Sequence, residues 1–191
     1  MEDTVNHSIA TELTPAEQQL LEVWEKHVHA EFAARNAQDA VRTMTDDVYV
    51  NNVPLLLGGK GKKGVEDFYS RYFLAQLPPD LQYTLISRTV GQNRLVEESV
   101  FGFTHSLVMD WFLPGVAPTG KRVEVAVVGV IQFREGRIAH EHLYWDQASV
   151  LVQLGLIDER TLPVAGVQVA RRMQDATVPM NGLIASPPRT S

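Results

Sequence analysis

Residues 121–145 read KRVEVAVVGVIQFREGRIAHEHLYW, and this stretch decides the fold. Two strand-type segments, 121–133 and 137–145, flank Glu135-Gly136, which is a hairpin turn signal. Upstream, segments 81–90 and 94–109 are separated by another turn, Gly91-Gln92-Asn93. The second of these segments predicts a long strand with one face formed by Leu95, Glu97, Ser99, Phe101, Phe103 and His105. The second half of the chain therefore predicts an antiparallel meander.

Helical signals precede these strands. Thr14-Pro15-Ala16-Glu17 combines a capping box with proline at the first helical position, which predicts a helix to about Arg35. Further helices are predicted at 39–44 and 62–76, with a short strand at 48–50 and a glycine-rich turn at 58–61. Asp146 is a good cap for a last helix, 147–154, and another helix is expected at 164–175. Helices first and strands second predict an α+β fold, with helices on one face of a curved sheet.

Length and composition limit the classes of function. The 191 residues fit one domain, predicted at 14–158, with a tail at 1–13 and an extension at 159–191. A net charge of -6 argues against nucleic acid as a partner. Without cysteine the chain has neither disulfides nor thiolate chemistry, which suits the cytoplasm. The polar N-terminus predicts no signal peptide, and no apolar run is long enough to predict a membrane span.

Several short motifs, taken in order, resemble one family. They are Gly58-Gly59 through Phe68-Tyr69, Phe103-Thr104-His105, Pro118 to Val123, and Gly136-Arg137-Ile138 running to Gln153-Leu154-Gly155. This set is similar to the SnoaL-like polyketide cyclase branch of the nuclear transport factor 2-like superfamily. The resemblance implies a cone formed by a curved antiparallel sheet wrapped over N-terminal helices, an apolar pocket, and a homodimer through the sheet. The superfamily includes cyclases, isomerases, hydrolases and non-enzymatic modules, so the fold alone leaves the function open.

The sequence departs from the cyclases at one position. Those enzymes resemble one another in a His-Trp-Asp run on the last strand. Alignment through the Gly-Arg-Ile turn places Glu141, His142 and Leu143 at these positions. Leucine therefore stands where a related cyclase has its acid, which weakens the expectation of the cyclase reaction itself.

The densest polar cluster is His140 to Asp146 on that strand. Alternation puts Glu141 and Trp145 on one face, and His140 and His142 on the other. If the first face lines the cone, burial beside Trp145 raises the pKa of Glu141 and makes it a general acid or base. The alternative is a structural ion pair with a neighbouring strand. Two histidines two residues apart could also bind a metal, with Asp146 or His105 as a third ligand, but hydrogen-bonded strand histidines are favoured and no metal is predicted.

The other candidate residues each have two interpretations. His105 is either a core residue or a catalytic residue that moves a proton or orients a carbonyl. Asp146 is first a helix cap and second a catalytic candidate. Asn52 and Asp110 are substrate-binding candidates that turn formation explains equally well. Tyr69, His142 and Trp145 complete the predicted binding set.

The preferred hypothesis is a cofactor-free enzyme that carries out acid/base chemistry on a small, largely apolar carbonyl or lactone compound. Glu141 takes a proton next to the carbonyl, and His105 or an asparagine amide stabilises the enolate. Isomerisation, cyclisation and hydrolysis remain open. The alternative is a non-catalytic small-molecule-binding or dimerisation module.

Overall fold

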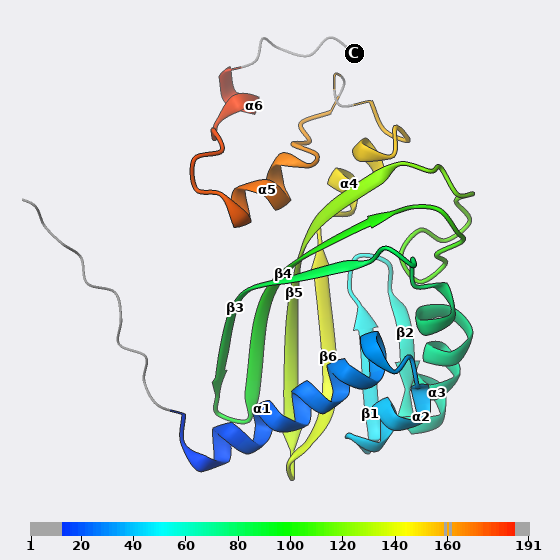
Figure 1. Cartoon of the computed structure of the whole chain (residues 1–191), viewed down its shortest axis with the longest axis vertical. Helices are drawn as coiled ribbons and strands as arrows, with labels where there is room; N and C mark the ends of the chain where they lie inside the picture. The colour runs from blue at the N-terminus through cyan, green and yellow to red at the C-terminus, as the bar shows by residue number, and fades with distance from the viewer. Residues whose placement is uncertain (1–12, 159, 161, 186–191) are drawn as a thin grey trace, which may run out of the picture.

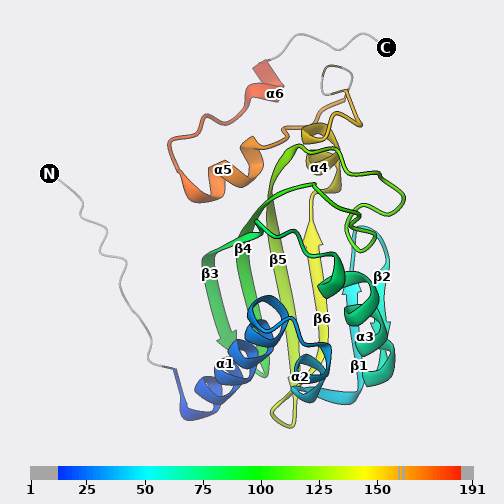
Figure 2. The same ribbon diagram turned by 45° about the vertical axis from the view of Figure 1, so that its right-hand side comes forward.

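The computed structural model describes residues 13–158, 160 and 162–185, and it has the predicted α+β architecture (Figures 1 and 2). The helical segments are α1 (Pro15–Val28), the π-helix η1 (His29–Ala33), α2 (Ala37–Arg42), α3 (Gly61–Phe68), the π-helix η2 (Tyr69–Phe73), the 3-10 turn η3 (Leu74–Gln76), α4 (Gln147–Gln153), α5 (Gln168–Gln174) and α6 (Gly182–Ala185). The strands are β1 (Met44–Asn52), β2 (Leu57–Lys60), β3 (Gln82–Gly91), β4 (Arg94–Thr104), β5 (Arg122–Arg134) and β6 (Arg137–Trp145).

The six strands form one curved sheet that does not close into a barrel. Its order is β2-β1-β6-β5-β4-β3. All neighbouring strands are antiparallel except β1 and β6, which run parallel with Val50 opposite Glu141. Helix α1 crosses one face of this sheet, while α5 and α6 lie at the opposite end of the molecule (Figure 1). The interior therefore lies between α1, α3 and the inward face of the sheet.

The predicted capping box at the start of α1 is present. The Thr14 hydroxyl accepts a hydrogen bond from the Glu17 backbone N–H at 3.3 Å, and the Glu17 carboxylate accepts one from the Thr14 N–H at 2.8 Å. Inside the sheet, β4 alternates as predicted, with Leu95 and Phe103 fully buried. These residues pack into one core with side chains from α1, α3 and β5.

Several boundaries differ from the prediction. The glycine-rich stretch predicted as a turn forms the edge strand β2, which pairs with β1 through Asn51 and Gly58. Strand β1 begins at Met44 instead of Val48. Strand β4 ends at Thr104 because the Ser106 N–H donates to the Thr104 carbonyl in a tight turn.

The ends of the chain add little to the sheet. Of the predicted tail, residues 1–12 lie outside the described residues. In the C-terminal part, α5 spans only 168–174 of the predicted 164–175. Helix α5 packs on β5, and Arg171 forms an ion pair with Glu124 at 3.5 Å. Within the described part of the chain, no helix has the length and apolar character that crossing a membrane requires.

Candidate functional site

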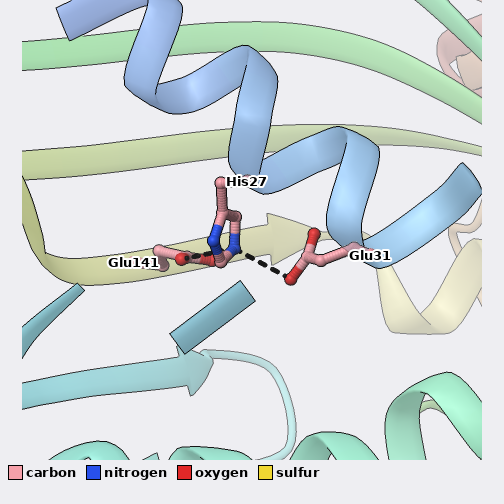
Figure 3. A group of neighbouring side chains, drawn as sticks. All are labelled: His27, Glu31 and Glu141. Atoms are coloured by element: carbon pink, nitrogen blue, oxygen red, sulfur yellow. Dashed lines mark hydrogen bonds and ion pairs between the residues drawn. The ribbon is translucent and has the colours of Figure 1, made fainter. Parts of the chain in front are cut away.

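Three buried polar side chains meet between α1 and the sheet (Figure 3). His27 comes from α1, Glu31 from η1 and Glu141 from β6, and they are 0%, 5% and 2% exposed. The His27 Nε2 atom lies 3.0 Å from Glu31 Oε1 and 3.1 Å from Glu141 Oε1. Only the contact with Glu31 has hydrogen-bond geometry, so Glu141 Oε1 has no hydrogen-bond partner in the described part of the chain.

Helical spacing brings His27 and Glu31 to the sheet. Leu20, Trp24, His27 and Glu31 recur every three or four residues, so they form one stripe along the helix. The indole ring of Trp24 stacks on the His27 ring, with centroids 5.6 Å apart and planes at 19°. Glu31 lies in the π-helical turn η1, a type of irregularity that often marks functional sites.

Strand alternation brings Glu141 to the same place. Glu141 is buried while His140 and His142 on either side are only partly so, which identifies its face of β6 as the inward one. Tyr69, the first residue of η2, contacts the cluster from the other side. Its hydroxyl lies 3.5 Å from both Glu141 Oε2 and His27 Nε2.

The hydrogen bonds of His27 fix where its protons lie. Nδ1 is 3.2 Å from the Ala40 carbonyl, which can only accept. It is also 2.8 Å from the Thr43 hydroxyl, which already donates to that same carbonyl at 2.7 Å. Nδ1 therefore carries a proton, and Nε2 faces two carboxyl groups. A bare lone pair on Nε2 would repel two carboxylates, which favours one acid proton between Nε2 and the two carboxyl groups. With that proton, the cluster carries a net charge of -1.

The electrostatics agree with a shared proton. Burial lowers the pKa of His27, but the carboxylates of Glu31 and Glu141 outweigh burial and hold that pKa well above its usual value. Burial raises the pKa of Glu141, and attraction to His27 only partly opposes this. Burial, followed by the charge of Glu141, raises the pKa of Tyr69 well above its usual value, so Tyr69 is a neutral hydroxyl that can donate.

The predicted residues divide into those near this cluster and those elsewhere. Glu141 and Tyr69 belong to it. Asn52 lies on the inward face of β1 and is 2% exposed. It is paired with Leu143, two residues beyond Glu141 on β6. The Asn52 Oδ1 atom has no hydrogen-bond partner among the described residues. Trp145 shares the inward face but stacks on Phe112, with centroids 4.9 Å apart, and donates to Gln147.

His105 is buried but separated from Glu141. Leu95 on β4 is paired with Ile131 on β5, which is paired in turn with Glu141 on β6, so these three residues lie in one row across the sheet. His105 lies ten residues beyond Leu95, which is roughly 30 Å along an extended strand. Its Nδ1 accepts from the Thr119 N–H at 3.3 Å, and burial lowers its pKa. The catalytic and binding roles assigned to both His105 and Asn52 stay predictions.

The remaining predicted residues have structural partners. Asp146 caps α4 by accepting from the backbone N–H groups of Ala148 and Ser149. Asp110 accepts from the Gln76 amide at 3.2 Å. His142 lies on the outer face of β6, 3.1 Å from the Tyr49 hydroxyl, and stacks on His140. The structure brings none of these three beside Glu141.

His27 and Glu31 are site residues that were not predicted from the sequence. The signal was present, because both residues fall in the apolar stripe of an amphipathic helix, where a buried charge needs a partner. No sequence pattern identifies Glu141 as this partner, because the contact requires the docking of α1 on β6.

Comparison with known proteins agrees with this architecture. The sequence matches the SnoaL-like domain over residues 24–141, which is more than half of the chain. The chain belongs to the SnoaL-like domain family. A comparison with curated proteins gives no significant match.

Solved structures share the SnoaL-like fold. A protein from Jannaschia sp. CCS1 described as a SnoaL-like polyketide cyclase has a TM-score of 0.64 at 17% identity, over 77% of this chain and 99% of that chain. AclR from Streptomyces galilaeus, described as a hydroxylase, has a TM-score of 0.58 at 18% identity, over 74% and 99%. An M. tuberculosis epoxide hydrolase has a TM-score of 0.55 at 15% identity, over 74% and 93%. At these identities the likeness concerns the fold, and the resemblance to SnoaL-like proteins predicted from the sequence is confirmed.

Proposed function

We propose that this SnoaL-like protein is an enzyme that moves a proton on a small, largely apolar carbonyl or lactone compound. Glu141 is the proposed catalytic residue. The observation that carries the proposal is the contact of its buried carboxyl group with His27 and Tyr69. A carboxyl group inside an apolar fold is a strong base toward a carbon acid, because water does not stabilise its charge.

The neighbouring groups give each step a partner. Glu141 takes the proton from the carbon next to the carbonyl, and the neutral Tyr69 hydroxyl can donate to the oxygen that becomes negative. Before the transfer, His27 lies beside the Glu141 carboxylate and offsets its charge. Isomerisation and cyclisation share this first step, whereas in hydrolysis Glu141 would take its proton from an attacking water molecule. The proposal therefore covers proton transfer to Glu141 and leaves the individual product open.

The proposal can be tested before a natural substrate is known. Deuterium incorporation from D2O next to the carbonyl of small ketones and lactones reports proton abstraction directly and is followed by NMR. We expect exchange catalysed by the wild-type protein and slowed about 10²–10⁴-fold in Glu141→Gln. The matched control is Glu98→Gln on β4, where the Glu98 carboxylate accepts from Ser87 on the exposed side of the sheet.

Two outcomes would contradict the proposal. Equal exchange in the wild type and Glu141→Gln would remove Glu141 from the chemistry. Absence of exchange across the panel, with binding of the same compounds, would favour the competing proposal of a non-catalytic binding module. Leu143, at the position where related cyclases have their acid, is the observation that favours this second proposal.

A further inference from the structure

The space between His27, Glu31 and Glu141 also suits a metal ion. Nε2 and one carboxylate oxygen from each glutamate lie within 4.8 Å of one another. Tetrahedral ligands at bond lengths of about 2.0–2.1 Å are about 3.3–3.4 Å apart. The two Nε2–oxygen distances, 3.0 and 3.1 Å, are already close to that separation. Figure 3 shows the imidazole between the two carboxylates.

The surroundings of His27 resemble the second layer of a metal site. A ligating histidine usually donates its other ring N–H to a carbonyl or carboxylate, which fixes the ring and leaves the second nitrogen free to coordinate. His27 Nδ1 donates to the Ala40 carbonyl and the Thr43 hydroxyl, and its Nε2 is the atom that faces Glu31 and Glu141. His27 and Glu31 are four residues apart, so one helical face presents both.

A buried ligand atom without a hydrogen bond and the negative charge of the cluster both favour a cation. Glu141 is 2% exposed, yet its Oε1 atom lacks a hydrogen-bond partner among the described residues while lying 3.1 Å from Nε2. With the acid proton, the cluster carries one negative charge. A divalent ion that replaces this proton brings the charge of ion and ligands to zero, because the imidazole is then neutral and the two carboxylates balance the ion.

We infer that His27, Glu31 and Glu141 form a binding site for a divalent first-row transition-metal ion, of the Zn²⁺ or Mn²⁺ kind. One imidazole nitrogen and two carboxylate oxygens favour such ions over soft Cu(I). Binding displaces the shared proton, so one proton leaves for each ion bound. A second consequence rests on the proposed function. The metal-bound cluster cannot accept a proton from the substrate, so the ion inhibits the enzyme.

The binding test uses the full chain and the metal alone. Chelator-treated protein is titrated with Co²⁺ while its visible absorption is recorded, and Zn²⁺ binding is measured by equilibrium dialysis. Proton release is followed with an indicator dye in weak buffer. We expect one ion per chain, a visible Co²⁺ spectrum and about one proton released per ion. Glu31→Gln and His27→Gln should each weaken binding at least tenfold.

Matched controls lie on the same helical segment. Glu22→Gln and His29→Gln change exposed side chains and should leave binding unchanged. Because His27→Gln removes a buried ring, circular dichroism checks its fold, and Glu31→Asp gives a second variant that keeps the charge but shortens the reach. The Co²⁺ spectrum and the number of protons released are measured on the wild-type protein, so these two tests do not depend on whether a variant folds.

The outcomes separate the two proposals. Wild-type protein without a Co²⁺ spectrum or proton release, or with binding equal to that of His27→Gln, would overturn the metal site. Deuterium exchange in chelator-treated protein tests the proposed function without any metal. Metal binding with exchange unaffected by Glu141→Gln would leave the metal site standing and remove the proposed function.

Discussion

The indole of Trp24 donates a hydrogen bond to Glu97 at 3.0 Å, although the two residues are 73 positions apart. Glu97 also accepts from Arg88 at 2.6 Å and from the Tyr83 hydroxyl, so its buried carboxylate has three donors. The same indole ring also stacks on the ring of His27. Trp24 is thus shared by two buried polar clusters, one in which Glu97 pairs with Arg88 and one in which Glu31 and Glu141 face His27.

Replacing Trp24 tests this shared position. Trp24→Phe keeps an aromatic ring beside His27 but removes the N–H that Glu97 accepts. We expect a loss of about 1–3 kcal/mol in the free energy of unfolding, since a buried carboxylate loses a donor. Trp145→Phe is the control, because the Trp145 N–H donates to Gln147 in a partly exposed position and should cost less. Urea denaturation measures both. An unchanged midpoint for Trp24→Phe would show that Glu97 does not need the indole.

Tyr69 should matter more for catalysis than for stability. Its hydroxyl is 3.5 Å from its partners, too long for a strong bond in the resting protein, but it can donate to a developing negative charge. Tyr69→Phe is expected to slow deuterium exchange about tenfold or more, as loss of a hydrogen bond to a charged group predicts. Tyr72→Phe changes an exposed residue of the same π-helix and serves as the control. A shifted unfolding midpoint together with an unchanged exchange rate would contradict this role.

Gly59 allows β2 to approach α3. A Cβ atom at Gly59 would lie 2.4 Å from the Gly64 carbonyl oxygen and 2.7 Å from the Val65 Cα atom, and both are backbone atoms that cannot move aside. Gly59→Ala should therefore destabilise the fold by about 1–3 kcal/mol, the usual cost of overpacking. Gly64→Ala is the matched control, because its nearest contact is an ordinary 3.9 Å. Thermal unfolding of the two variants should differ clearly, and equal melting temperatures would contradict the close approach.

Asp80 should make a contribution to the free energy of unfolding that depends on pH. Hydrogen bonds from the Thr104 hydroxyl and backbone N–H lower the pKa of Asp80 and outweigh the effect of burial. A carboxyl group with a lowered folded-state pKa stabilises the fold above its unfolded-state pKa, and this stabilisation is lost as pH falls through the folded-state pKa. Asp80→Asn should be less stable than wild type at pH 7 and approach it below about pH 4. Urea midpoints across pH test this, with exposed Asp67→Asn as control. A difference that does not vary with pH would exclude the linkage.

The features that could be predicted from the sequence depend on interactions between residues close together in the chain. The Thr14 capping box, the hairpin at Glu135-Gly136 and the alternation around Glu141 depend on neighbours in sequence, and all are present. The edge strand β2 was missed because its conformation depends on pairing with β1 and on close contact with α3. His27 was missed as a site residue for the same reason. Its role depends on Glu141, which reaches it only through the packing of a helix on a distant strand.

The parallel pairing of β1 with β6 has a consequence for how the protein folds. The two strands of a hairpin can join as soon as the turn between them forms, but β1 can pair with β6 only after this last strand of the sheet has been made. Contacts between residues so distant in sequence form slowly, because a long loop must close first. Glu141 and Tyr69, 72 residues apart, therefore meet only near the end of folding. While β6 is still inside the ribosome, His27 and Glu31 lack their third partner, Glu141.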